Sequence, residues 1–288
     1  MVESKQDNEA ASSGKAGNDD ELLKQRMGRV KHKIAVISGK GGVGKTLVAV
    51  NLAATLAIGK GFGKVGLLDA DIHGPCVPKM LGLKGSRLES GPPGIMPVLS
   101  ESGIKVVSMA FLLPSDDSPV VWRGPVKMGA IRQLLSEVAW GTLDYLLVDL
   151  PPGTGDEPLT VLQLLPEADG VVIVTIPSEV SGDVVRKAVT FARMLKVPII
   201  GIVENMSGMI CPHCGKEIEV FSGGMGRRVA EEMAVPFLGS IPMDPEIAES
   251  SDCGTPFVLR HPDSVSSKAF SDIASKIREI VEGEKQIK

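Results

Sequence analysis

The stretch "GKGGVGKT", residues 39–46, decides the fold of this 288-residue chain. It fits the pattern G-x-x-x-x-G-K-[ST] and lies between a β-rich run, "KIAVIS" (33–38), and a helical pattern over 45–58. Glycines in such a loop let backbone N–H groups turn inward around phosphate oxygens, and the helix start adds the positive end of its dipole. A glycine-rich turn that only joins a strand to a helix is the alternative, but spacing and context both favour a phosphate-binding loop.

Individual residues of this loop have separate expected roles. The backbone cradle comprises Gly39, Gly41, Gly42, Val43 and Gly44. Lys45 is expected to reach the β- and γ-phosphates, and the Thr46 hydroxyl to hold Mg²⁺. Lys40 is an additional lysine, which would be unremarkable as a solvated surface charge. Within this loop, however, its ammonium could reach a phosphate on the facing subunit of a dimer, as an arginine finger does in trans.

Acidic residues follow two further apolar runs. "LLDAD" places Asp69 and Asp71 at the end of one run, and "LLVDLPPGTGD" places Asp149 at the end of another. Strand ends of this kind border the ligand crevice of a parallel sheet. Asp149 is expected to hold Mg²⁺ through water, and the N–H of Gly153 to sense the γ-phosphate. Turn or helix-cap roles are the alternative for these aspartates, but three of them beside such a loop favour phosphoryl transfer.

The identity of the base rests on one residue. "VENMSG" ends a predicted strand with Asn205, whose side chain is expected to hydrogen-bond the edge of the base. A guanine-binding site would usually continue as N-K-x-D, whereas Gly208 occupies the third position after Asn205. The sequence therefore favours ATP over GTP.

Strand and helix patterns alternate along most of the chain. Strands are predicted over 33–38, 64–69, 145–150, 170–176, 198–204 and 237–241, and helices over 45–58, 126–139, 158–165, 180–195, 224–233 and 266–282. Nearly continuous apolar strands that alternate with helices predict an α/β fold with a doubly wound, mostly parallel sheet, of P-loop NTPase type. The stretch 94–111 breaks the alternation, and we predict a small hairpin inserted at an edge.

Composition and charge narrow the classes of protein. Residues 1–30 are mostly polar and predict a flexible tail with helical character near "ELLKQRM", ahead of a single domain over 31–288. The net charge of −4 gives no general attraction to nucleic acid or anionic lipid. No apolar run approaches ~18 residues, so no membrane span is expected. Four cysteines form no disulfide framework, which favours a reducing compartment, and we predict a cytoplasmic protein.

The stretch "CPHCG" (211–215) supplies two metal ligands, Cys211 and Cys214. Tetrahedral zinc and the cubane iron–sulfur cluster each require four. Cys76 and Cys253 lie far away in the sequence beside turn glycines, and structural roles are expected for both. If two chains meet around a twofold axis, one pair from each chain completes the site. The local motif does not distinguish zinc from iron–sulfur.

Five stretches together resemble one family. "SGKGGVGKT", "LLDADIHGP", "WRGP", "LDYLLVDLPPGTGD" and "CPHCG…FSGG" closely resemble the Mrp/ApbC iron–sulfur cluster carrier ATPases, members of the deviant Walker A (MinD/ParA-like) class. The resemblance covers about residues 30–285 and implies a homodimer, with ATP near the interface and a labile cluster, of 4Fe-4S type, shared between subunits. It also implies acceptor apoproteins as partners, and it favours iron–sulfur over zinc in the cell.

The resemblance assigns roles to individual residues. Lys40 matches the signature lysine, Asp71 the switch-I acid that positions water, and Asp149 the switch-II acid. Cys211 and Cys214 match the cluster ligands. The residues that match the adenine-binding positions are Asn205, Pro242 and Asp244.

Departures from the family's pattern occur in "DIHGPC". His73 and Cys76 stand where Tyr and Ser are expected, and we predict a buried or turn histidine and a small buried thiol. The tail also lacks the N-terminal four-cysteine site of the eukaryotic scaffold branch.

Two other functions compete with cluster carriage. A partitioning or positioning ATPase of the MinD/ParA type, with a structural zinc at the cysteine pair, would share the fold. The net charge, the absence of a basic amphipathic terminus and the cysteine pair disfavour it. An electron-donating reductase like the nitrogenase iron protein would use widely separated single cysteines, which disfavours that reading as well.

Overall fold

The computed structural model describes residues 20–58, 63–113, 115, 122–210, 214, 216–218, 220 and 223–283. Its centre is a nine-stranded sheet in the order β10-β9-β8-β1-β7-β2-β6-β5, with β11 also paired to β9. The parallel strands are β1 (Val30–Ile37), β2 (Val65–Asp69), β6 (Lys105–Ser108), β7 (Leu143–Asp149), β8 (Gly170–Thr175), β9 (Ile199–Ile210) and β11 (Phe237–Met243). The short β5 (Val98–Leu99) and β10 (Glu217–Ile218) run antiparallel to their neighbours.

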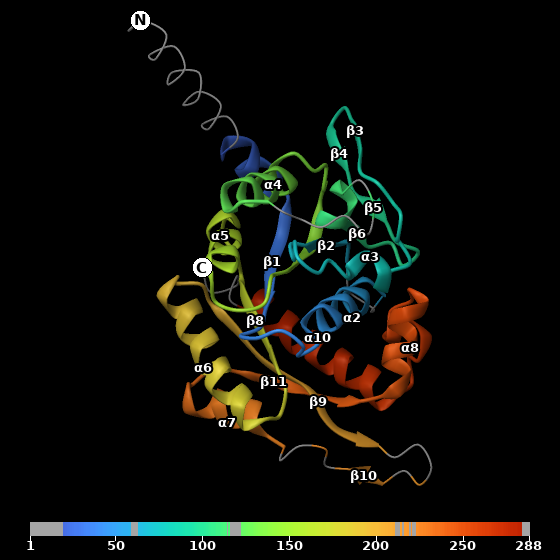
Figure 1. The fold of residues 1–288 in the computed structure, drawn as a ribbon, viewed down its shortest axis with the longest axis vertical. Helices are drawn as coiled ribbons and strands as arrows, with labels where there is room; N and C mark the ends of the chain where they lie inside the picture. Colours follow the sequence, from blue (N-terminus) through green and yellow to red (C-terminus); the bar gives the residue numbers. More distant parts are fainter. Residues whose placement is uncertain are drawn as a thin grey trace, which may run out of the picture.

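Helices cover both faces of the sheet (Figure 1). One layer contains α2 (Lys45–Ile58), α3 (Val77–Met80), α9 (Phe257–Arg260) and α10 (Val265–Gly283). The other contains α4 (Gly124–Ser136), α5 (Asp156–Leu164), α6 (Glu179–Met194) and α7 (Met225–Glu232). Between the layers, side chains alternate along each strand: Ile34 and Val36 face the first layer, Ala35 and Ile37 the second. Strands buried on both faces explain the continuous apolar runs in the sequence.

The prediction of a mostly parallel α/β fold is confirmed, with differences at the edges of the sheet. The stretch 94–111 contains the predicted hairpin, formed by β5 and β6. Its second strand, β6, is however part of the main sheet and pairs parallel with β2. A separate two-stranded sheet, β3 (Glu89–Gly91) with β4 (Gly94–Met96), was not predicted. The short helices η1 (Met109–Leu112), α3, α8 (Pro245–Cys253) and α9 were not predicted either.

The packed part of the chain begins earlier than the predicted boundary at residue 31. Residues 20–27 form a helix, and its Leu23 and Met27 are 6% and 1% exposed within the core. Asp20 at its start pairs with Arg132 of α4. Apolar side chains four positions apart give this helix one face to bury, whereas residues 1–19 lie outside the described part of the chain.

Within the described ranges, no helix has both the length and the apolar character that a membrane span requires.

Candidate functional site

Predicted residues of the nucleotide site lie at the edge where the parallel strands end. β1, β7 and β2 are adjacent in the sheet and run in the same direction, so the loops that follow them share this edge. The loop after β1 contains the glycine-rich stretch, the loop after β2 contains Asp71, and β7 ends with Asp149. β9 runs parallel to β8, which pairs with β1, and therefore points to the same edge.

Lys45, Thr46 and Asp149 form a compact cluster. The Lys45 Nζ lies 2.6 Å from Asp149 Oδ1, and the Thr46 hydroxyl donates a 2.6 Å hydrogen bond to Asp149 Oδ2. The side chains of Lys45 and Asp149 are 6% and 0% exposed. Burial raises the pKa of Asp149, while the charge of Lys45 and the hydrogen bonds from Lys45 and Thr46 act in the opposite direction. The cluster joins one cation to oxygen atoms of the kind that Mg²⁺ prefers.

Asn205 holds the glycine-rich loop. Its Nδ2 donates a 3.0 Å hydrogen bond to the carbonyl oxygen of Val43. Gly44 has a φ of +78°, and a Cβ at that position would lie 2.3 Å from Asn205 Nδ2. Only glycine combines this backbone conformation with such a close approach. The side chain expected to bind the base therefore also positions the loop, a contact that the sequence alone did not predict.

A cavity of about 230 Å³ lies against the loop, lined by residues that include Lys45, Thr46, Asp71 and Cys76. A second cavity, of about 310 Å³, shares Gly44 and Leu47 with the first. It is lined by the three residues predicted to bind the base and by several methionines: Asn205, Pro242, Asp244, Met206, Met209 and Met243. The structure thus places Lys45, Thr46 and Asp71, expected near the phosphates, and the three residues expected around the base in the linings of two adjoining hollows.

Gly153 and Lys40, both predicted to act on the phosphates, have the following contacts within the chain. The Gly153 N–H donates a 2.8 Å hydrogen bond to the carbonyl oxygen of Ser38. Ser38 in turn donates from its hydroxyl to the carbonyl oxygen of Lys40. The Lys40 side chain is half-buried and forms no hydrogen bond or ion pair with the described part of the chain.

Asp69 and Asp71 have contrasting surroundings. Asp69 is fully buried and accepts hydrogen bonds from the Ser108 hydroxyl and the backbone N–H groups of Asp71 and Val77. Burial and the charge of Asp149 raise the pKa of Asp69 to about 8, against the opposing effect of Lys45. The half-buried Asp71 accepts from the N–H groups of the next turn, those of His73 and Gly74.

The sequence did not predict a charged cluster beside Asp71. Lys127 of α4 is almost buried, and its Nζ lies 2.5 Å from Glu157 Oε1 of α5 and 2.7 Å from His73 Nε2. His73 is exposed and lies in a turn. Of the two predicted environments, a buried position and a turn, the structure shows the turn. The cluster connects the segments that follow β2 and β7. In the sequence, the one indication of this cluster was Lys127, which directly follows "WRGPV".

The three cysteines that the structure describes, Cys76, Cys214 and Cys253, are all exposed. Ile210, the last residue of β9, is followed directly by Cys211, which lies outside the described residues, and Cys214 is exposed. Cys76 is also exposed, so the prediction of a small buried thiol there is wrong: the residue lines the cavity beside the glycine-rich loop. Cys253 is exposed at the end of α8. Within the described residues, no group of three or more His, Cys, Asp or Glu side chains is arranged to hold a metal ion.

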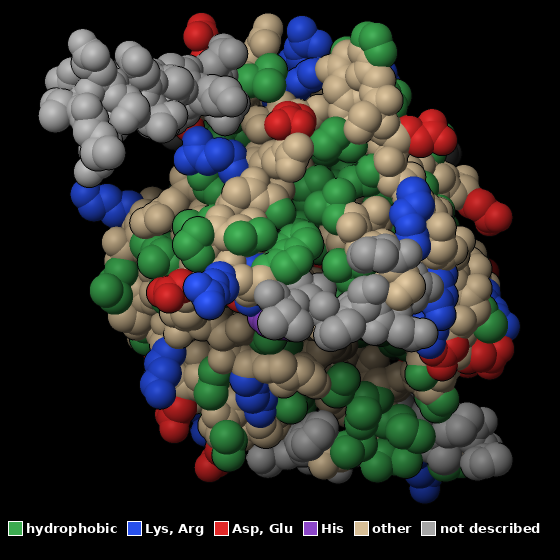
Figure 2. Space-filling model, turned by 45° about the horizontal axis from the view of Figure 1, so that its top comes forward, with side chains coloured by type: hydrophobic (Ala, Val, Ile, Leu, Met, Phe, Trp, Pro, Cys, Tyr) green, Lys and Arg blue, Asp and Glu red, His purple; other side chains and the backbone are tan. Residues whose placement is uncertain are grey.

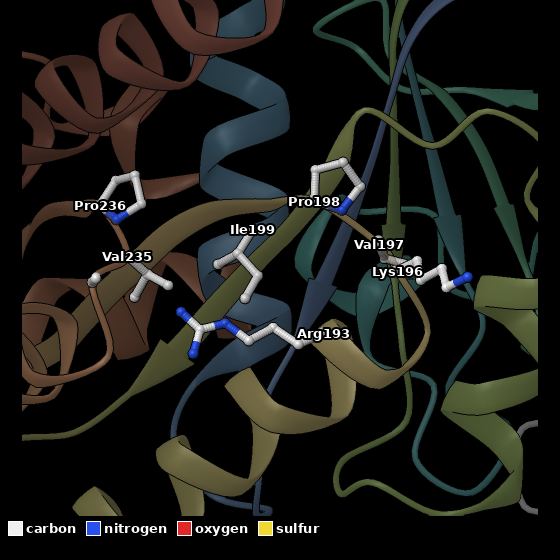
Figure 3. Close-up of a pocket in the computed structure, with 8 residues that line it drawn as sticks. Arg193, Lys196, Val197, Pro198, Ile199, Val235 and Pro236 are labelled. Carbon is white, nitrogen blue, oxygen red and sulfur yellow. The ribbon is translucent and has the colours of Figure 1, made fainter.

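Two surface features complete the description. On the face shown in Figure 2, basic and acidic side chains are interspersed rather than gathered by sign. Another hollow, of about 410 Å³, lies near the starts of β9 and β11, and Arg193 and Lys196 are among its lining residues. Figure 3 shows that the Arg193 guanidinium points toward Val235 and the Lys196 ammonium points away from it. The two cations do not converge on a common point.

Comparison with known proteins gives the family. The family model that matches is ParA, described as NUBPL iron-transfer P-loop NTPase, and it covers residues 29–278. The chain belongs to this family. The predicted resemblance to iron–sulfur cluster carrier ATPases of the ParA-like class is thereby confirmed.

Several known proteins are similar to this chain over most of their own length. An iron–sulfur cluster carrier protein of Methanocaldococcus jannaschii is 53% identical over 93% of this chain and 91% of its own. One of Saccharolobus solfataricus is 54% identical, over 91% and 88%. A nucleotide-binding protein of Archaeoglobus fulgidus, solved in complex with ADP and with cobalt, has a TM-score of 0.73 and 44% identity over 82% and 91%. The MinD cell division ATPase of Pyrococcus furiosus, at 22% identity and a TM-score of 0.63 over 87% and 99%, shares the fold.

Proposed function

We propose that this protein binds and slowly hydrolyses ATP in order to carry an iron–sulfur cluster, of 4Fe-4S type, to acceptor apoproteins. The cluster is held between two copies of the chain by Cys211 and Cys214 of each. The proposal is supported most by one observation: the strand whose Asn205 holds the glycine-rich loop runs on to Ile210, the residue before Cys211. One strand therefore serves both a nucleotide site and a cargo site.

On the nucleotide side, the chain offers donors and acceptors suited to a magnesium-bound triphosphate. Lys45 is the cation for the β- and γ-phosphates, and Lys40 acts on the phosphate of the facing subunit. The oxygen atoms of Thr46 and Asp149 suit Mg²⁺, directly or through water, and the metal would neutralise charge on the phosphates. Asp71, beside the same cavity, orients the attacking water.

On the cargo side, the chain supplies two thiolates and a dimer supplies four, the number that a cubane cluster takes. Zinc accepts the same four thiolates, so a zinc-filled site in isolated protein is compatible with the proposal. The protein acts in the cytoplasm, with neither nucleic acid nor a membrane as partner.

Anaerobic reconstitution tests this function. The protein is incubated with iron and sulfide, and its visible spectrum and iron content per dimer are measured. Transfer to an apo-acceptor is then followed with and without Mg-ATP. We expect a thiolate-bound cluster and ATP-dependent transfer. A protein that takes up zinc but no cluster would instead support a partitioning ATPase with a structural zinc.

A further inference from the structure

A buried acid precedes the residue that holds the glycine-rich loop. Glu204 is 1% exposed and lies in the sheet between Thr175 of β8 and Ser240 of β11. Its Oε2 accepts a 2.6 Å hydrogen bond from the backbone N–H of Gly226, and its Oε1 accepts a 2.9 Å hydrogen bond from the Ser207 hydroxyl. Gly226 lies in the first turn of α7, where N–H groups and the helix dipole stabilise a negative charge. These contacts offset the cost of burying a carboxylate.

The two partners of Glu204 flank the cysteine-bearing segment. Ser207 precedes Cys211 in the chain, and Gly226 follows Cys214. One carboxylate therefore ties both the outgoing and the returning ends of this segment to a single point of the sheet.

The start of the segment is weakly fixed by strand pairing alone. β11 pairs with β9 at Asn205 and again only at Met209, so the residues between them form an irregularity in the ladder. Met206 and Gly208 within it have φ values of +58° and +73°. A stretch without regular ladder bonds depends on side-chain contacts for its position, and the bond from Ser207 to Glu204 is such a contact.

The end of the cysteine-bearing segment, at the start of α7, packs closely against the Glu204 carboxylate. A Cβ at Gly226 would lie 3.1 Å from Glu204 Oε2 and 3.2 Å from Thr175 Cγ2. The start of α7 therefore packs directly on the carboxylate and leaves little room for a side chain.

The neighbouring residue faces the nucleotide loop. Successive side chains of a strand point to opposite faces of the sheet. Asn205 accordingly contacts Val43 on the face of α2, while Glu204 contacts α7 on the other. A displacement of this strand end moves both contacts together.

We infer that Glu204 is a positioning residue that couples nucleotide binding at the glycine-rich loop to metal binding at Cys211 and Cys214. The inference rests on the proposed function, in that both sites bind their ligands. Coupling between two sites is reciprocal and is measured as the ratio of affinities for one ligand with and without the other. A purely structural role for Glu204 would lower stability and leave this ratio unchanged.

The test uses the full-length chain and Co²⁺ as the metal probe, because cobalt–thiolate absorption reports binding directly. The Kd for Co²⁺ is measured with and without a non-hydrolysable ATP analogue and Mg²⁺. We expect a ratio of roughly 5–150 in the wild type, the usual range of such couplings. In Glu204→Ala the ratio falls toward one, although each ligand still binds alone. Glu204→Gln, which keeps an oxygen for the Gly226 N–H, retains part of the ratio.

Asp169→Ala is the matched control. Asp169 accepts a 2.7 Å hydrogen bond from the backbone N–H of Lys33, ahead of the start of β8 and away from the cysteine segment. This variant should lose stability and keep the wild-type ratio. If Glu204→Ala does not fold, Gly226→Ala, which crowds the carboxylate from the helix side, should lower the ratio in its place.

The outcomes separate the inference from the proposed function. A wild-type ratio preserved in Glu204→Ala, or in both Gly226→Ala and Glu204→Gln, overturns the inference and leaves the carrier function standing. A wild type that binds both ligands with a ratio of one overturns the inference too. Absence of nucleotide binding, or of cobalt–thiolate absorption, contradicts the proposed function itself.

Discussion

The carboxyl groups of Asp69, Asp71 and Asp149 lie at neighbouring strand ends but have different surroundings. Asp149 is engaged by Lys45 and Thr46, and Asp69, its register partner on the adjacent strand β2, is fully buried with a pKa raised to about 8. Asp71 is half-buried beside the cavity and, among the described residues, accepts hydrogen bonds only from backbone N–H groups of its own turn. Of the three, we propose that Asp71 acts on the attacking water.

Asp71→Asn tests that assignment. Because the change removes a charge near the attacking water and leaves the phosphate cradle intact, we expect kcat to fall by about 10²–10⁴-fold. Nucleotide affinity, measured by calorimetry, should stay close to the wild-type value. Unchanged turnover would remove Asp71 from the mechanism.

Asp69→Asn tests the raised pKa. A folded-state pKa of about 8 lies above the unfolded value of 3.8, so the folded protein holds the proton more tightly. The resulting stability is fully present below about pH 4 and is lost as the pH rises through about 8. Asparagine mimics the protonated acid, so the free energy of unfolding of the variant should depend less on pH across this window. Urea titrations at several pH values measure the difference, and parallel curves for the two proteins would show that Asp69 has an ordinary pKa.

At the scale of elements, the sequence predicted those whose pattern is local and missed those fixed by distant contacts. The strands β1, β2 and β7 each contain a continuous apolar run, which is enough to predict a buried strand without knowledge of its neighbours. β9 was predicted to end at residue 204, because "NMSGMI" has polar and glycine residues, and pairing with β11 and β10 extends it to Ile210. The helix over 20–27 was assigned to the tail, since its apolar face is short and the core it meets lies far along the chain.

That helix carries a prediction about the N-terminus. Met27→Ala should lower the free energy of unfolding by about 2–5 kcal/mol, because it opens a cavity in a packed core. Deleting residues 1–19 should leave the thermal midpoint unchanged, since Leu23 is the first buried side chain among the described residues. The control is an exposed change on the same helix, Lys24→Ala. Equal stability of Met27→Ala and Lys24→Ala would mean that this helix does not stabilise the core.

In the candidate site, as in the secondary structure, the sequence predicted local motifs and missed contacts between distant residues. The glycine-rich loop and the strand-end acids each belong to a short continuous motif that can be recognised in the sequence. Because each motif follows a strand of a parallel sheet, the motifs are expected to meet at one edge. The contacts of Asn205 with Val43, and of Lys127 with His73 and Glu157, join residues from different elements. Such contacts depend on the final packing of helices and loops, which no local pattern specifies.

At the scale of the whole molecule, the cysteine pair sets the expected assembly. A site completed by two chains should bind one metal ion, or one four-iron cluster, per dimer, and Cys211→Ala or Cys214→Ala should abolish binding, because each removes two of four ligands. Cys76→Ser and Cys253→Ser serve as controls and should retain the metal. Elemental analysis combined with light scattering measures both quantities. One ion or one cluster per chain, with loss in the Cys76 or Cys253 variants, would mean an intrachain site.

The engagement of Lys45 by Asp149 has a consequence for how the loop fills. The ammonium is already neutralised, so a bare polyphosphate cannot take it without leaving a buried carboxylate uncompensated. Asp149 can release the Lys45 ammonium only when another cation takes its place beside the carboxylate. Nucleotide and divalent metal should therefore enter together as one complex of reduced charge, and free phosphate in the cell should compete poorly for the same loop.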